Sequence, residues 1–231
     1  VLPLAGFVRP LLREAPWARA LEEVYRTLGN TFAYALMAAA IATMAGFVLA
    51  IAAGRDRKLR GVLLASLIVM FALPPALSAL GFIYAASVSP AGLDPLLRSR
   101  FTVGLDLALR SLPIAAVFGI RAVGTASPSW AEAAAVHGVS LTSYFRKVLG
   151  RWLLPAALLS ASLTALLATA DVSTVLLLHP PGETSLPLAI FTVMANAPEP
   201  LVSALCLFYI GGAAGILLLG LMIFSFVVRK R

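Results

Sequence analysis

The sequence contains little charge, one cysteine and two histidines, and each scarcity excludes a class of protein. Charged residues make up 12% of the 231 residues and hydrophobic residues 61%, whereas soluble domains are about a quarter charged. The lone Cys206 excludes an internal disulfide and a cysteine metal cluster. His137 and His179 fall on opposite sides of a predicted membrane span and therefore make no metal site. We expect neither a metal nor a cofactor.

Motifs for catalysis and nucleotide binding are also missing from the sequence. A phosphate-binding P-loop needs Gly-Lys before Ser or Thr, but Lys58, Lys147 and Lys230 each follow an arginine. The His-Glu-x-x-His and Gly-x-Ser-x-Gly motifs of hydrolases do not occur. We therefore expect that the protein is not an enzyme. If ATP drives its function, a partner chain binds and hydrolyses the ATP.

The sequence does contain long apolar runs without charge. Residues 32–53, 62–89 and 201–228 form such runs of 22, 28 and 28 residues. At about 1.5 Å per helical residue, even the shortest run crosses the roughly 30 Å hydrocarbon core of a bilayer. We predict an all-α, polytopic membrane protein with about five transmembrane helices in one domain. The predicted spans are 28–53, 62–86, 103–122, 153–178 and 201–228, so that the domain covers residues 28–228.

The eighteen basic residues predict how these spans are oriented. Eleven lie in or beside the connections 54–61 and 123–152 and in the tail 229–231, and six lie on the other side. Because cytoplasmic loops carry the excess of Lys and Arg, we place these three segments in the cytoplasm and residues 1–27 outside. Residues 1–12 are expected to be the tail of a missing first span. The basic residues that give the formal net charge of +8 lie at the ends of the predicted spans. They therefore indicate the topology, and no nucleic-acid partner is predicted.

Pro74 and Pro75 fall in the middle of the second predicted span. Proline removes a backbone donor and breaks or kinks a helix. In a membrane, the carbonyls freed in this way must face protein or a wet cavity. Two interpretations stay open: the kink lines a transport pathway, or it is an architectural bend.

Few charged residues lie inside the predicted spans. Asp171 follows eighteen uncharged residues, and an acid in a span is costly unless it is solvated or paired. We predict that Asp171, with Ser173 and Thr174, borders a translocation cavity or its gate. The alternative is a carboxylate paired within the chain or with a companion subunit. In the third span, the i, i+4 spacing of Asp106 and Arg110 predicts an ion pair near the outer interface.

The hydrophilic connection before the fourth span has the pattern of two short helices. Ser129 and Glu132 have the spacing of a capping box, which starts a helix. Gly138 is suited to the left-handed conformation that ends one. Ser140 then caps a second helix over 141–149. We predict a stiff helix pair in the coupling loop 124–151, held between two spans.

Glu132-Ala133-Ala134, followed after three residues by Gly138, resembles the EAA loop of the permease subunits of binding-protein-dependent ABC importers. In that family the loop forms coupling helices that dock into a groove of the ATPase subunit. The family usually has Leu-Pro twelve residues after the glycine, whereas this chain has Gly150-Arg151; Pro155 fits a second proline of many members. The residues to which the resemblance gives an ATPase-coupling role are Glu132, Ala133, Ala134, His137, Gly138 and Leu141.

This resemblance implies a cellular location and a set of partners. The expected partners are ABC ATPase subunits, a second permease half (identical, fused or homologous), a periplasmic substrate-binding protein and the lipid bilayer of the bacterial inner membrane. The stretch 178–182, Leu-His-Pro-Pro-Gly, is similar to the branch of the family that handles ferric iron, thiamine or phosphonates. The short apolar stretch 188–197 after it predicts an interfacial or re-entrant helix on the outer side.

Two other functions fit parts of the sequence. An ion-driven secondary transporter or channel subunit would favour more intramembrane acids and inverted repeats, and the sequence has one clear mid-span acid and no convincing repeat. A DNA-binding helix-turn-helix has a similar Ala-Ala-x-x-x-Gly-Val-Ser turn, but the connection between two spans leaves no third helix to complete its core. The ABC importer permease is therefore the predicted function.

Overall fold

The computed structural model describes residues 2–11, 16–89 and 94–229, and every regular element in these ranges is a helix. In chain order they are α1 (Leu2–Leu11), α2 (Trp17–Ala53), α3 (Arg57–Ala72), α4 (Pro75–Val88), α5 (Asp94–Leu97), α6 (Arg100–Thr125), α7 (Pro128–Val136), α8 (Leu141–Tyr144), the π-helix η1 (Phe145–Leu149), α9 (Gly150–Ala170), α10 (Val172–Leu178), α11 (Leu186–Met194) and α12 (Glu199–Arg229). Four helical stretches are long and apolar enough to cross a membrane, and the bent pair α3–α4, counted as one span, is a fifth. The predicted all-α chain with about five spans is confirmed.

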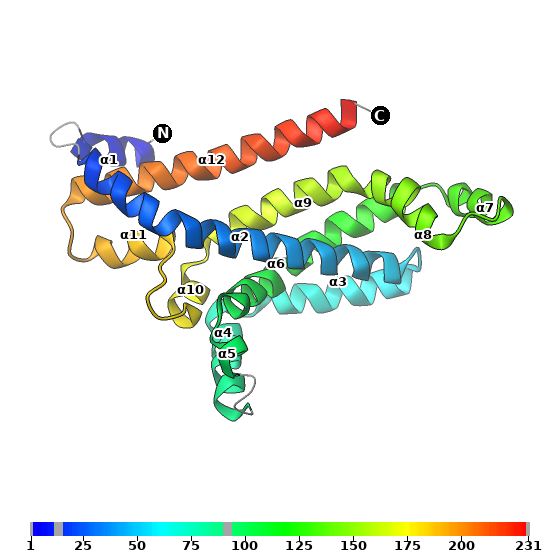
Figure 1. Ribbon diagram of the computed structural model, residues 1–231, viewed down its shortest axis with the longest axis horizontal. Helices are drawn as coiled ribbons and strands as arrows, with labels where there is room; N and C mark the ends of the chain where they lie inside the picture. Colours follow the sequence, from blue (N-terminus) through cyan, green and yellow to red (C-terminus); the bar gives the residue numbers. More distant parts are fainter. Residues whose placement is uncertain (1, 12–15, 90–93, 230–231) are drawn as a thin grey trace.

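Small residues bring α2 and α6 together at the centre of the bundle. A Cβ added to Gly46 would lie 2.7 Å from the backbone nitrogen of Ala116, and one added to Gly119 would lie 2.8 Å from Ala50 Cβ. Such residues let helix backbones approach closely in a bilayer. Helix α9 packs along both α2 and α6, and these three helices form the core (Figure 1).

The second predicted span is broken where its two prolines stand. Helix α3 ends at Ala72, α4 begins at Pro75, and the two axes differ by 88°. Leu73 is extended, the conformation that a following proline favours, and Pro75 occupies the first position of α4, where it needs no amide hydrogen. The predicted break at Pro74 and Pro75 is confirmed, and 62–86 is two helices rather than one.

The fourth predicted span, 153–178, is wrong at its outer end. Helix α9 ends at Ala170, and Asp171 leaves the helical conformation with φ −87° and ψ 95°. Its carboxylate accepts a hydrogen bond from the Thr174 amide at 3.1 Å and so caps α10. An aspartate that bonds nearby backbone amides competes with a continuous helix, which explains the interruption.

The outer ends of the first and last spans also differ from the predicted bounds. Helix α2 begins at Trp17 rather than at residue 28, so the later part of 1–27 continues directly into the first span. Helix α12 begins at Glu199, and only 6% of its apolar window is buried, which leaves most of it to lipid or to another chain. The short apolar helix predicted over 188–197 is present as α11, with Leu186, Leu188 and Ala189 buried.

Figure 1 shows which connections share an end of the bundle. The α2–α3 connection and the α7–α8 pair lie at the right-hand end of the view, and α12 runs toward the same end. Helices α1, α10 and α11 lie at the opposite end. Two of the segments that carry the excess of Lys and Arg, the connections 54–61 and 123–152, therefore lie at the same end of the bundle.

Candidate functional site

The first helix of the coupling loop begins earlier than the predicted capping box. Helix α7 starts at Pro128 with Ser127 in the cap position, and Ser127 makes no capping hydrogen bond from its side chain. Its hydroxyl is instead 2.7 Å from the Ser129 hydroxyl. Proline is favoured at the first helical position, which moves Ser129 inside the first turn. The predicted Ser129–Glu132 capping box is therefore wrong, although the helix itself is present.

The turn after α7 has the geometry that the glycine predicts. Gly138 has φ +63°. Its amide donates to the Ala135 carbonyl at 3.1 Å, and the Val139 amide donates to the Ala134 carbonyl at 2.9 Å. These two bonds are those of a Schellman motif, in which a left-handed glycine closes a helix. Ser140 then accepts a hydrogen bond from the Ser143 amide at 3.4 Å, as the predicted second cap requires.

The second helix of the pair continues into the next span. Helix α8 passes into η1, where the Gly150 amide donates to the Phe145 carbonyl, and η1 passes into α9. Together they form one helical stretch of 30 residues, Leu141–Ala170. A Cβ added to Gly150 would lie 2.8 Å from the Phe145 carbonyl oxygen. The π turn therefore requires glycine at this position, where the family that the loop resembles usually has leucine.

Side chains at the base of the α7–α8 helix pair attach it to the bundle. The rings of Trp130 on α7 and Trp152 on α9 meet edge to face, with centroids 5.0 Å apart. Both rings, with Tyr144, pack against a buried cluster that includes Leu149 and Leu153. Arg55, in the α2–α3 connection, donates to the Ala126 carbonyl just before α7. Motion of the pair relative to α9 is restricted by these contacts.

The tip of the pair is exposed and partly apolar. Val136 is 84% exposed and Leu141 71% exposed, and they flank the Gly138 turn on both sides. The six residues to which the resemblance gives a coupling role lie in this one projecting segment, and all are exposed except Ala134, which is half-buried. We name residues 127–149 the coupling elbow.

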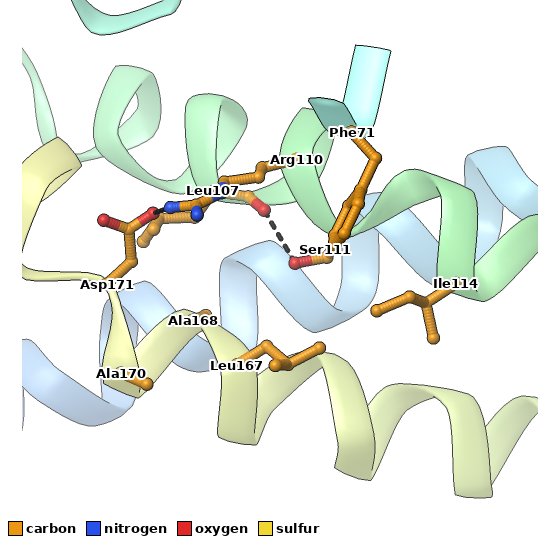
Figure 2. A pocket seen from close by; sticks show the side chains of 9 residues that line it. All are labelled: Phe71, Leu107, Arg110, Ser111, Ile114, Leu167, Ala168, Ala170 and Asp171. Carbon is orange, nitrogen blue, oxygen red and sulfur yellow. Dashed lines mark hydrogen bonds and ion pairs between the residues drawn. The ribbon is translucent and has the colours of Figure 1, made fainter. Parts of the chain in front are cut away.

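At the far end of α9, the helix break holds a charged pair. Figure 2 shows the Arg110 side chain on α6 reaching across to the Asp171 carboxylate, with which it forms an ion pair. The Asp171 side chain is 5% exposed and that of Arg110 36% exposed. The sequence spacing predicted Asp106 as the partner of Arg110, and this prediction is wrong. The Asp171 carboxylate, at the break between α9 and α10, takes that place.

Asp106 lies in the interior of the helix bundle. It is 1% exposed, and its Oδ2 is 3.0 Å from the Thr174 hydroxyl on α10. The same hydroxyl is 3.2 Å from Oδ2 of Asp171. Asp106 Oδ1 has no hydrogen-bond partner in the part of the chain that the structure describes. Sequence reasoning missed this cluster because its members lie up to 68 residues apart.

A cavity of 160 Å³ opens beside the ion pair. Its walls come from α3, α6 and α9 and from the break itself, as Figure 2 shows. The lining residues are Phe71, Leu107, Arg110, Ser111, Ile114, Leu167, Ala168, Ala170 and Asp171. Of the five residues predicted to form a pathway or gate, Asp171 lines this cavity, and Thr174 is hydrogen-bonded to Asp171 without lining the cavity. Pro74, Pro75 and Ser173 are outside this lining, and Ser173 is exposed.

A second cluster, which the sequence did not predict, fixes the loop between α10 and α11. Glu183 accepts hydrogen bonds from Arg100 Nε at 2.5 Å and from the Tyr34 hydroxyl at 2.9 Å. Asn30 donates to the Thr184 carbonyl at 3.2 Å, and Thr31 accepts from the Leu186 amide at 2.8 Å. The loop is thereby attached to both α2 and α6.

No family model matches the chain, and no curated protein matches it. Among residues 2–11, 16–89 and 94–229, no group of three or more His, Cys, Asp or Glu side chains is placed to hold a metal ion. The chain is therefore described by its architecture, as a helical protein with four or five candidate membrane spans.

Proposed function

We propose that the chain is the membrane-spanning permease subunit of an ATP-driven ABC importer. The observation that carries the proposal is the single helical stretch Leu141–Ala170. At about 1.5 Å per residue it is about 45 Å long. It begins in the exposed coupling elbow and ends at the break that carries Asp171, beside the cavity. A force applied to the elbow is therefore delivered to the cavity wall.

The partner that applies the force is an ABC ATPase subunit in the cytoplasm. Closure of the ATPases on ATP moves the elbow, and the Trp130–Trp152 contact passes the motion to α9. Because Asp171 is paired with Arg110, α9 and α6 move as one body, and the cavity opens toward one side and then the other. A second permease half completes the pathway across the open cavity wall.

The grouping of basic residues supports the orientation. The α2–α3 connection and the coupling elbow share one end of the bundle (Figure 1), and both carry basic residues, as cytoplasmic segments do. We place this end and the C-terminus in the cytoplasm of a bacterium and residues 1–27 outside the inner membrane. The opposite end, with the loop that Glu183 fixes, then meets a periplasmic binding protein that delivers ferric iron or another small solute.

An ion-driven secondary transporter is the second candidate, and one observation favours it. The bent pair α3–α4 and the interrupted pair α9–α10 meet, since α10 packs against α4. Discontinuous helices form the ion and substrate sites of many secondary transporters. Such a carrier needs no ATPase, so the presence or absence of that partner separates the two candidates.

Co-purification of the native complex tests the proposal. The variants Glu132→Arg and Gly138→Pro change the exposed elbow, and proline is incompatible with the positive φ of Gly138 because its ring fixes φ near about −65°. Both are expected to lose most of a stoichiometric ATPase partner, at least about tenfold, as truncation of an interface hot spot does. Glu22→Arg, the same charge change on an exposed residue at the other end of α2, should retain it. Retention of the ATPase and of ATP-dependent uptake by both elbow variants would disprove the coupling role.

A further inference from the structure

Asp106 lies where both broken spans meet, and the transport mechanism described above does not use it. Helix α6, which carries Asp106, contacts both α4 and α10, and α4 contacts α10. The carboxyl is 1% exposed and touches α10 through Thr174. An ionisable group buried at such a junction in a membrane protein is costly, and it usually serves a function.

The hydrogen bonds around Thr174 require one more hydrogen than the hydroxyl supplies. Its oxygen lies 3.0 Å from Oδ2 of Asp106 and 3.2 Å from Oδ2 of Asp171. A hydroxyl donates one hydrogen and accepts through its lone pairs, while an ionised carboxylate only accepts. If both acids were ionised, one of the two contacts would be a repulsion between oxygens. Both contacts become hydrogen bonds when one of the acids carries a proton.

The charges identify which acid is protonated. Asp171 is paired with the Arg110 guanidinium, so its negative charge is compensated. Asp106 has Asp171 and Arg110 as its charged neighbours, and Arg110 gives its ion pair to Asp171. The other polar group that faces Asp106 supplies no cation: the Ser78 hydroxyl on α4 interacts with the Asp106 carboxyl and donates to the Pro75 carbonyl. An ionised Asp106 would thus be a buried charge without an ion pair of its own, which is costly within a membrane span.

We propose that Asp106 is a proton-binding site and that its carboxyl is neutral in this structure. Its proton is on Oδ2 and is donated to the Thr174 hydroxyl oxygen. The Thr174 hydroxyl in turn donates its own hydrogen to Asp171, which faces the cavity. The chain Asp106–Thr174–Asp171 links the buried carboxyl to the cavity, and each contact then has one donor and one acceptor.

The same chain is a route by which the proton leaves. Asp106 passes its proton to the Thr174 oxygen, the Thr174 hydrogen moves to Asp171, and Asp171 releases a proton to water in the cavity. Two ionised carboxylates then face one hydroxyl, and their repulsion separates α10 from α6 at the junction of the broken spans. Loss of the proton therefore changes the packing at the cavity wall, whichever energy source drives transport.

Infrared spectroscopy of the protein purified in a detergent without carbonyl groups tests this proposal. At neutral pH we expect the carbonyl-stretch band of a protonated carboxylic acid, and we expect Asp106→Asn, which keeps the size and removes the proton, to abolish it. Asp56→Asn is the matched control, because Asp56 is an exposed helix cap and the substitution should leave the band unchanged. Absence of the band in the unaltered protein, or its persistence in Asp106→Asn, would overturn the proposal.

Thr174→Val provides a test that keeps Asp106 in place. This variant removes the acceptor of the proposed hydrogen bond, so the acid band should remain and move to higher frequency. An unshifted band would show that Thr174 does not accept the proton. The measurement requires no solute and no ATPase, so its result is independent of whether the chain belongs to an importer.

Discussion

Single glycines determine how closely the two central helices approach. Gly46 on α2 faces the backbone of Ala115 and Ala116 on α6, and Gly119 on α6 faces Ala50. Backbone atoms have no rotamer through which to yield, so these positions admit no side chain without separating the helices. By contrast, Gly211 on α12 has no atom within 4 Å of an added Cβ.

Gly46→Ala should therefore destabilise the protein, because the new methyl group would lie 2.7 Å from a backbone nitrogen of α6. Overpacking of this kind costs about 1–3 kcal/mol. Gly211→Ala should leave stability unchanged or raise it by up to about 1 kcal/mol, since alanine is the better helix former. Thermal unfolding of both variants in detergent checks this. Equal melting temperatures for the two would contradict the close packing of α2 and α6.

The charged residues show what sequence reasoning supplied at this scale and what it did not. Asp171 was recognisable as costly because it interrupts an apolar run, and pairing within the chain was one of the alternatives for it. Its partner Arg110 was not recognised, because i, i+4 spacing made Asp106 the obvious one. The true pair joins α6 to a helix break 61 residues away. Only the packing of α9 against α6 brings them together.

At the scale of helices, the two broken spans differ in how far they were predictable. The break at Pro74 and Pro75 follows from proline chemistry alone, whereas the break at Asp171 depends on a capping bond to Thr174 that competes with the helix. The π turn η1 left no recognisable signal except Gly150, which appeared as a departure from the Leu-Pro of the EAA family. The structure gives that departure a reason, since a Cβ there would meet the Phe145 carbonyl.

Gly150→Ala should loosen the joint between the coupling elbow and α9. Its Cβ would lie 2.8 Å from the Phe145 carbonyl oxygen, so the π turn must open or rearrange. If this costs about 1.4 kcal/mol, amide hydrogen exchange across residues 141–149 becomes about tenfold faster. Gly61→Ala on α3, where an added Cβ meets nothing within 4 Å, is the control and should leave exchange there unchanged. Unaltered exchange in Gly150→Ala would contradict a glycine-dependent joint.

At the scale of the whole molecule, the elbow and the cavity lie at the two ends of one helical stretch. The number of spans and the grouping of basic connections were predictable, because run lengths and Lys and Arg positions reflect the bilayer directly. The cavity and the attachment of the α10–α11 loop were not predictable, since they arise from contacts between residues far apart in sequence. Glu183, held by Tyr34 and Arg100, attaches the α10–α11 loop to α2 and α6. The opposite end of α9 continues into the exposed coupling elbow.

The central claim is that the coupling elbow faces the cytoplasm, where an ATPase reaches it. Because Cys206 is the single cysteine, Cys206→Ser gives a background for single-cysteine labelling. Ser140→Cys is at the exposed elbow, and Pro181→Cys is at an exposed position of the α10–α11 loop. In sealed, right-side-out cells, a membrane-impermeant maleimide should label Pro181→Cys at once and Ser140→Cys only after permeabilisation. Labelling of Ser140→Cys in the sealed cells would contradict the orientation and, with it, the proposed function.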